Sequence, residues 1–337
     1  MTTIVGHKKI LSLLEQTVVN GTPAHAYLFT GPDGIGKRLV AEQFARWLNC
    51  PDPGHDERTA CSVCRRIRQG NHPDVILEKP DKGRIRIDRI RTIQGFFVYA
   101  PVEGRFRVCV IDDAHTMNRP AQNALLKTLE EPPAGRILIL VTSTPSLLLP
   151  TVRSRCRRIR FGALPTELLS TLLQGKGMPP ERASVLAAMS AGSVSRAIHM
   201  DASDFFALRE KMISALTDPG GLSMPGLLDL SMELSKDKRS ATEALEMALT
   251  LLRDLMLTAA VPNASGVIHG DFLDRMNAAA QHLSADRILS LYEDVVRASE
   301  LIESEINVNR NLVMDVLLLR ISRTVGGPTL GIGASAR

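Results

Sequence analysis

Residues 31–38 read Gly-Pro-Asp-Gly-Ile-Gly-Lys-Arg, a stretch that matches a phosphate-binding loop at every position except the last. Such a loop has the pattern Gly-x-x-x-x-Gly-Lys followed by Ser or Thr. Its backbone N–H groups cradle the phosphates, the lysine reaches the terminal ones and the hydroxyl binds Mg²⁺. Gly31, Gly36 and Lys37 fill their places, but Arg38 stands where the hydroxyl belongs. Because a guanidinium has only donors and cannot bind a cation, the sequence predicts a phosphate-loop fold that lacks a group needed for hydrolysis.

The segments on either side of the loop support this interpretation. Residues 26–30 form a short apolar run that suits a buried strand, and residues 37–48 place apolar side chains at helical spacing. A strand, a glycine-rich turn and a helix aim helix-terminal N–H groups at an anion. The alternative is a glycine turn that arose by chance, since short motifs of this kind have false positives.

Composition limits the class of protein. A chain of 337 residues corresponds to about two or three domains, and 44% apolar with 23% charged residues is ordinary for a globular protein. We expect a cytoplasmic protein, because the N-terminus lacks the features of an export signal and no apolar run reaches about 18 residues. Thiols stay reduced there, so the five cysteines are expected to be metal ligands or core residues. The net charge of +5 permits contact with nucleic acid, but a single Trp and three Tyr argue against a base-stacking surface.

The chain changes character after residue 162. Before it, strand-like and helix-like segments alternate, which predicts an α/β domain with a parallel sheet and helices on both faces. After it, only helical periodicity remains. The predicted strands are 26–30, 74–78, 106–111, 137–142 and 157–161, and two further predicted helices are 87–99 and 117–129. The predicted domains are 1–162 with a cysteine-rich insertion at 50–64, a compact helical unit at 163–204, longer amphipathic helices at 205–325 and a disordered tail at 326–337.

Two acids follow the third predicted strand. In a phosphate-loop fold this strand carries the acid that holds Mg²⁺. Asp112 takes that position, and Asp113 takes the place of the acid that polarises the attacking water, one methylene shorter than the usual Glu. The alternative is a strand that ends in a helix cap. Thr142, at the end of the fourth predicted strand, is a weaker candidate whose hydroxyl would lie beside a γ-phosphate.

Three cysteines have metal-ligand spacing. Cys61 and Cys64 are separated by two residues, which suits two thiolates on one tetrahedral metal, and Cys50 lies within reach of a loop. We predict a structural zinc site with His55 as the nearest suitable fourth ligand. A redox pair and ordinary cysteines are the other interpretations. The alternative fourth ligands are Asp52, Asp56 and His72.

A basic run occupies residues 153–160, with five arginines around the triplet Ser154-Arg155-Cys156. One interpretation is a solvated face or a strip that contacts phosphates. The other is that Arg155 is an arginine finger, which neutralises transition-state charge in the active site of a neighbouring subunit. The residue pattern alone leaves both open.

Together these residues resemble the bacterial clamp-loader subunits of the AAA+ class, in particular the delta-prime family of DNA polymerase III subunits. The resemblance covers nearly the whole chain, and the stretch 123–133 and the Ser-Arg-Cys triplet are its most specific parts. Subunits of the related tau/gamma family carry a hydroxyl after the loop lysine, so Arg38 favours delta-prime. The matching stretches are HAYLFTGPDGIGKR (25–38), GNHPD (70–74), VIDDAHTMNRPAQNALLKTLEEPP (110–133), TVRSRCRRIRF (151–161), GSVSRAI (192–198) and NVNRNLVMDVLLLR (307–320).

The resemblance implies an AAA+ domain at 1–162, a small helical lid at 163–204 and an all-α collar at 205–325 that holds a ring of clamp-loader subunits. It implies that Arg155 acts in trans on ATP bound by a neighbouring gamma subunit. Arg196 matches the sensor-two segment of the lid, where it would touch a phosphate or pair with an acid. The residues predicted for a degenerate nucleotide site are Gly31, Gly34, Gly36, Lys37, Arg38, Asp112, Asp113, Thr142 and Arg196.

The sequence departs from the family pattern in two places. Zinc modules of the family have four cysteines, and Arg58 stands where the second would lie, so the predicted site depends on a substitute such as His55. The phosphate loop, in contrast, is better preserved than in some delta-prime subunits. Binding of nucleotide without turnover is therefore left open.

We predict a non-catalytic stator subunit of the clamp loader, and so a component of the DNA-directed DNA polymerase holoenzyme. It would bind structural Zn²⁺ and would not hydrolyse ATP/Mg²⁺ by itself. With tau/gamma and delta subunits it would form a hetero-oligomer that loads the sliding clamp onto primed DNA. One alternative is an active ATPase of the gamma type. The other is a regulator that binds DNA directly through its basic run.

Overall fold

The computed structural model describes residues 4–51, 61–218, 223–261, 266–304 and 308–326. The chain forms two compact units, Met1–Leu172 with Ala191–Arg196, and Leu173–Ser190 with Ala197–Arg337. Residues 163–204, predicted as a separate lid, are shared between these units, and the three-domain division stays a prediction. The predicted disordered tail lies outside the described residues except for its first member, Gly326.

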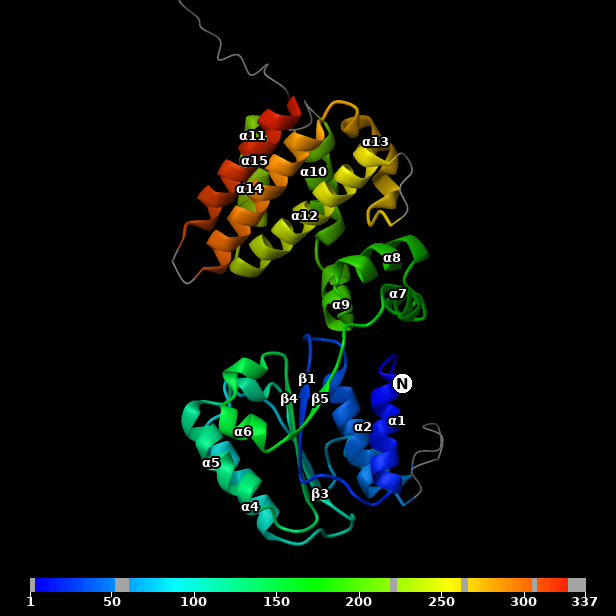
Figure 1. Ribbon diagram of the computed structural model, residues 1–337, viewed down its shortest axis with the longest axis vertical. Helices are drawn as coiled ribbons and strands as arrows, with labels where there is room; N and C mark the ends of the chain where they lie inside the picture. The colour runs from blue at the N-terminus through cyan, green and yellow to red at the C-terminus, as the bar shows by residue number, and fades with distance from the viewer. Residues whose placement is uncertain (1–3, 52–60, 219–222, 262–265, 305–307, 327–337) are drawn as a thin grey trace, which may run out of the picture. The chain divides into compact units, whose positions relative to one another are not determined.

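The first unit is built on a five-stranded sheet in the order β2-β3-β4-β1-β5, and every neighbouring pair is parallel (Figure 1). The central strands are buried on both faces, as expected where helices cover each side. The predicted α/β fold with a parallel sheet is confirmed, and no predicted strand end is displaced by more than one residue. The strands are β1 (Ala26–Thr30), β2 (Val75–Glu78), β3 (Arg107–Ile111), β4 (Arg136–Thr142) and β5 (Arg157–Arg160).

Alternating side chains of the strands point to opposite faces of the sheet and pack into two separate hydrophobic cores. Tyr27 and Phe29 of β1 belong to the core beneath α1 (Lys8–Val19) and α2 (Lys37–Asn49). Leu28 belongs to the opposite core, beneath the helices drawn on the other side of the sheet in Figure 1. Those helices are α4 (Ile87–Val98), α5 (Arg119–Glu130) and α6 (Pro150–Ser154), and the smaller elements of the unit are α3 (Ser62–Arg68), η2 (Ala114–Thr116) and η3 (Pro145–Leu147).

The predicted helix at 117–129 begins later than expected. Asn118 has extended backbone and its side chain accepts a hydrogen bond of 3.0 Å from the backbone N–H of Ala121. This contact satisfies one of the N–H groups that the first turn leaves without an intrahelical partner. Helix α5 therefore begins at Arg119, two positions after the predicted start.

A buried carboxylate fixes the connection between α4 and β3. Asp74 accepts hydrogen bonds of 2.8 Å from the backbone N–H groups of Val102, Glu103 and Gly104, and its Oδ1 atom lies 3.4 Å from Nε of Arg107. Burial disfavours the charge of Asp74, but these donors outweigh burial and hold its pKa below the usual range. The last residue of the GNHPD stretch thus has a structural role.

The elements of the second unit are all helical within the described ranges, as predicted. Helix α12 (Lys238–Ala260) packs against α10, α13, α14 and α15, and most of its buried side chains are alanine or leucine, which allows close helix packing. None of the helices within the described ranges has the length and apolar character needed to cross a bilayer. The helices, including two that continue into the first unit, are α7 (Thr166–Gln174), α8 (Pro180–Met189), α9 (Val194–Ala202), α10 (Phe205–Thr217), α11 (Met224–Leu234), α12 (Lys238–Ala260), η4 (Gly270–Phe272), α13 (Leu273–Ala280), α14 (Ala285–Glu303) and α15 (Arg310–Gly326).

A buried polar network holds the connection between α12 and α13. Nε of Arg209 donates to Nδ1 of His269 at 2.8 Å, and Nη1 of the same arginine donates to Asp271 at 2.7 Å. Asp254 of α12 accepts two backbone hydrogen bonds of 2.8 Å from the segment before η4. Burial, with Arg209 beside it, lowers the pKa of His269 to about 3, so the imidazole stays neutral at physiological pH.

Candidate functional site

The phosphate loop needs glycine at two positions because other chain segments approach it closely. A Cβ atom added at Gly31 would lie 2.4 Å from the carbonyl oxygen of Phe161. A Cβ atom at Gly34, whose φ is +70°, would lie 2.3 Å from Oγ of Ser193. Gly36, also left-handed with a φ of +97°, is the N-cap of α2. The loop thus adopts a backbone that leads directly into a helix N-terminus.

The predicted sensor-two segment lies on this loop. The backbone N–H of Ser195 donates a hydrogen bond of 3.3 Å to the carbonyl oxygen of Gly34. The backbone N–H of Arg196 donates a hydrogen bond of 3.2 Å to Oγ of Ser193, which itself faces the loop. The structure therefore brings Arg196 to the neighbourhood of the loop, and a contact between its guanidinium and a phosphate stays a prediction.

Lys37 is folded into the loop. Its side chain is buried, and Nζ donates to the carbonyl oxygens of Gly31 at 2.8 Å and Pro32 at 2.5 Å. Burial lowers the pKa of Lys37, and the nearby acids Asp33 and Asp113 oppose this shift. The ammonium group thus has carbonyl partners that a bound phosphate would have to replace.

Arg38 lies beside the acid predicted to bind Mg²⁺. Its Nε atom is 3.9 Å from Oδ2 of Asp112 and 3.3 Å from Oε1 of Glu42, one turn further along α2. Burial and the adjacent Asp113 raise the pKa of Asp112, while Arg38 opposes that shift. The guanidinium therefore brings positive charge towards Asp112 without offering a metal ligand.

The other predicted residues lie at the same edge of the sheet, where the carboxyl ends of parallel strands meet. Asp113 has a left-handed backbone (φ 47°), and its N–H donates to Oδ1 of Asp112 at 3.2 Å. Thr142 is fully buried, and its Oγ1 atom lies within hydrogen-bond distance, 3.2 Å, of Nδ1 of His115. Sequence reasoning missed His115, although its position two residues after the acidic pair was a usable signal.

Arg155 directly follows the last residue of α6 and is partly exposed. Its Nη2 atom is 2.8 Å from Oε1 of Glu130, and Nη1 donates a hydrogen bond of 3.0 Å to the carbonyl oxygen of Thr151. The side chain of Arg155 is 36% exposed. The other arginines of the basic run are exposed, and they are Arg153, Arg157, Arg158 and Arg160. Sequence reasoning missed Glu130, which no local pattern links to Arg155.

The three predicted thiols come together. The sulfur atoms of Cys50, Cys61 and Cys64 all lie within 4.8 Å of one another, and those of Cys50 and Cys61 are 3.7 Å apart. Two thiolates on a tetrahedral zinc, each about 2.3 Å from the metal, are about 3.8 Å apart, so the cluster fits zinc. Cys61 also caps α3 by accepting the backbone N–H of Cys64 at 3.5 Å. Burial raises the pKa of the Cys64 thiol, so a metal ion would be needed to hold it as thiolate.

Within the described ranges, no fourth residue joins the three thiols to complete a possible metal site. His55, Asp52 and Asp56 lie outside the described residues. His72 is described but does not belong to the thiol cluster, and its Nδ1 atom accepts a hydrogen bond of 3.1 Å from the backbone N–H of Asp74. Among the candidate ligands, His72 thus contacts the backbone before β2 rather than the thiols.

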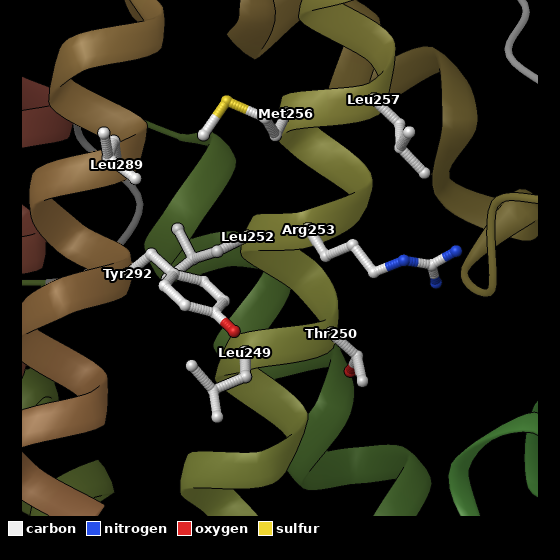
Figure 2. Close-up of a pocket in the computed structure, with 8 residues that line it drawn as sticks. All are labelled: Leu249, Thr250, Leu252, Arg253, Met256, Leu257, Leu289 and Tyr292. Carbon is white, nitrogen blue, oxygen red and sulfur yellow. The ribbon is translucent and has the colours of Figure 1, made fainter.

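The second unit carries an apolar cavity of about 460 Å³ along α12 (Figure 2). Leu289 and Tyr292 of α14 extend toward α12, whereas Arg253 points away from α14. Apolar hollows of this kind mark contacts with proteins, membranes or apolar ligands. The lining residues are Leu249, Thr250, Leu252, Arg253, Met256, Leu257, Leu289 and Tyr292.

Comparisons with known proteins find DNA polymerase III subunits for both units of the chain. The family model described as DNA polymerase III, delta subunit matches residues 6–165, and the one described as DNA polymerase III, delta subunit, C terminal matches residues 203–323. DNA polymerase III subunit gamma/tau of Mycobacterium tuberculosis (strain ATCC 25618 / H37Rv) is 30% identical over 329 residues, and the match covers 88% of this chain and 56% of that longer protein.

Two full-length relatives share one description. DNA polymerase III subunit delta' of Bacillus subtilis (strain 168) is 29% identical over 316 residues, which cover 93% of this chain and 95% of the relative. DNA polymerase III subunit delta' of Escherichia coli (strain K12) is 31% identical over 306 residues, which cover 89% of this chain and 90% of the relative. With identity at this level over nearly the whole of both chains, this chain belongs to the delta-prime family of DNA polymerase III subunits.

Proposed function

We propose that this chain is the stator of a bacterial clamp loader, a subunit that supports ATP-driven loading of the sliding clamp onto primed DNA without hydrolysing ATP itself. The observation that carries the proposal is Arg38, which replaces the Mg²⁺-binding hydroxyl and lies 3.9 Å from Asp112. The same substitution argues against an independent ATPase, because the site gains a fixed positive charge and loses a metal ligand.

The chain contributes to hydrolysis through Arg155 rather than through its own loop. In this proposal Arg155 reaches ATP bound by a neighbouring tau/gamma subunit and stabilises the charge that develops on the transferred phosphoryl group. The loop residues, with Lys37 already buried between carbonyl oxygens, hold nucleotide without turnover or remain empty.

Structural zinc is part of the proposal. Cys50, Cys61 and Cys64 would hold the ion with His55 as the fourth ligand, and the ion would supply no chemistry beyond tying the end of α2 to α3. A closed set of four ligands is typical of structural sites, whereas catalytic zinc keeps a position open for water.

The proposed partners are tau/gamma and delta subunits, which form a hetero-oligomer in the cytoplasm and contact the clamp and DNA as a complex. The apolar cavity along α12 supports an assembly role for the second unit, because such a surface is covered most favourably by another protein.

The experiment that tests the proposal is ATP turnover by the purified chain alone and within a reconstituted complex. We expect no Mg²⁺-dependent turnover by the chain alone and full support of clamp loading in the complex. Turnover by the chain alone that disappears in Lys37→Ala would overturn the stator proposal in favour of a gamma-type ATPase.

A DNA-binding regulator is the second candidate, favoured by the exposed arginines on the edge strand β5 and before it. Such a protein would bind DNA by itself with an affinity that falls steeply as salt rises. Titration of labelled primed DNA with the isolated chain at two salt concentrations separates this candidate from the stator.

A further inference from the structure

The guanidinium of Arg155 contacts two groups of the same chain, a carboxylate and a backbone carbonyl. Glu130 lies 2.8 Å from Nη2, and the carbonyl oxygen of Thr151 accepts a hydrogen bond from Nη1. These contacts engage both terminal nitrogens but not all the N–H groups of the planar fork, so donors remain for a phosphate. Glu130 is also the last residue of α5, whose C-terminal end favours a nearby cation.

Packing fixes the relative positions of the two partners. Leu129, next to Glu130, is 3% exposed, and Val152 of α6 is fully buried. Both side chains belong to the same core on the α4–α6 face of the sheet. Because protein cores are close-packed, the end of α5 and the end of α6 keep a constant spacing. The ion pair is thus a feature of two anchored helix ends.

We infer that Glu130 is a positioning residue that orients Arg155 toward a phosphate group of a nucleotide bound by the neighbouring subunit. This inference rests on the proposed trans role of Arg155. A long arginine side chain loses conformational freedom when it meets a ligand, and that loss weakens the contact. An acid that already holds one side of the guanidinium lowers the loss, which is how pre-organised sites gain rate.

The opposite effect is competition, in which Glu130 restrains Arg155 and a phosphate has to displace it. The two effects predict opposite signs when the carboxylate is removed. Pre-organisation is favoured because the side chain of Glu130 is 49% exposed. The field of such an acid is screened by water, while its contact still limits the rotamers of the arginine.

The test uses a complex reconstituted from this chain with tau/gamma and delta subunits, in the presence of clamp and primed DNA. The reference is the part of the ATP turnover that Arg155→Ala removes. We expect Glu130→Ala to lower that part about two- to fivefold, the range of an exposed ion pair, through kcat with little change in KM. Glu130→Gln, which keeps an acceptor oxygen but loses the charge, should give an intermediate value. Glu131→Ala removes the adjacent acid at the same helix end and should behave like the wild type.

A double-mutant cycle decides how Glu130 acts. If it acts through Arg155, adding Glu130→Ala to Arg155→Ala changes nothing further. A further loss in that background, or higher turnover in Glu130→Ala alone, would overturn the positioning role. If Arg155→Ala lowers turnover and Glu130→Ala does not, only the positioning role fails. An Arg155→Ala complex with full turnover instead removes the trans role itself, and the positioning role with it. Gel filtration establishes that every variant chain assembles.

Discussion

Two arginines of the first unit have nearly the same exposure and opposite consequences. The side chain of Arg38 is 39% exposed and that of Arg155 is 36% exposed, and each lies beside a carboxylate of its own chain. The partner of Arg38 is Asp112, the acid that a working nucleotide site needs for its metal ion. The partner of Arg155 is Glu130, which no nucleotide chemistry of this chain requires.

The difference indicates that the effect of an arginine on a nucleotide site depends on which carboxylate it pairs with. At the loop, Arg38 lies beside Asp112, the acid predicted to bind Mg²⁺, and we expect its positive charge to weaken the binding of that ion. At the end of α6, the pairing leaves the metal-binding acid untouched and leaves N–H donors for a ligand outside the chain. In the proposed function, Arg38 therefore weakens the nucleotide site of this chain, and Arg155 stays available to a neighbouring subunit.

The largest expected effect is at Arg155. In a reconstituted complex, Arg155→Ala should lower hydrolysis by about 10³-fold or more at the one site that borrows this residue. Total turnover should fall only in part, because other sites of the complex do not use it. Arg155→Lys should rescue poorly, since an ammonium lacks the planar fork that grips phosphate. Steady-state ATPase assays measure both.

The neighbouring arginines are the control for that prediction. Arg157→Ala and Arg158→Ala remove comparable exposed charges from β5 and should leave ATP turnover close to the wild-type rate. Equal defects at all three positions would show that the arginines act as a basic strip on DNA. The contrast between Arg38 and Arg155 would then have no functional meaning.

Local patterns were sufficient to predict the sheet and the loop, because the apolar runs and the glycines carry that information over a few residues. They misplaced the start of α5, where the cap formed by Asn118 decides the boundary. They could not link Glu130 to Arg155 or His115 to Thr142, since these contacts depend on how separate elements pack. The three thiols were found because their spacing is itself a local pattern.

Removing the predicted zinc ion should affect the helix that begins at the phosphate loop of Arg38 but not the region of Arg155. We expect about one zinc ion per chain, lost in Cys61→Ser and in Cys64→Ser, because three remaining ligands hold zinc poorly. His55→Ala should weaken binding if His55 completes the site. The loss should loosen the end of α2, the helix that begins at the phosphate loop, and leave turnover that depends on Arg155 unchanged.

Metal analysis by mass spectrometry, with hydrogen exchange over α2 and α3, measures both consequences. Cys156→Ser is the matched control, because burial raises the pKa of that thiol to about 12 and it lies outside the cluster. Cleanly purified wild-type protein with much less than one equivalent of zinc would rule the site out.

A smaller effect is expected from restoring the missing hydroxyl. Arg38→Thr should raise the affinity for ATP in Mg²⁺ about tenfold, or about 1.4 kcal/mol, because it returns a metal ligand and frees Asp112. Turnover should stay absent, since Asp113 is shorter than the usual glutamate. Titration with a fluorescent ATP analogue, with Mg²⁺ or with EDTA, measures the gain. An affinity of Arg38→Thr that does not respond to Mg²⁺ would contradict this account of the loop.

The smallest effect concerns the stability cost of Asp112. Burial and Asp113 raise the pKa of this carboxyl above its ordinary value of 3.8, so the folded chain holds the proton more tightly than the unfolded chain. Its contribution to stability is therefore lost as pH rises from about 3.8 through the raised pKa. Asp112→Asn should stabilise the protein by about 0.5–1 kcal/mol at pH 7, the usual gain when a destabilising functional group is removed.

The pH dependence of that gain, measured by urea unfolding, separates it from a simple packing change. The advantage of Asp112→Asn should vanish well below pH 3.8, where both the folded and the unfolded forms of the wild type carry a neutral Asp112. Asp74→Asn is the control of opposite sign, because backbone N–H donors hold the pKa of Asp74 low and the folded state there favours the charge. Its loss of stability should grow as pH rises from the lowered pKa of Asp74 to above 3.8, and should then stay constant up to neutrality. If Asp112→Asn were destabilising at pH 7, the attraction between Arg38 and Asp112 would outweigh the cost of burying the carboxylate, and this ion pair would stabilise the loop.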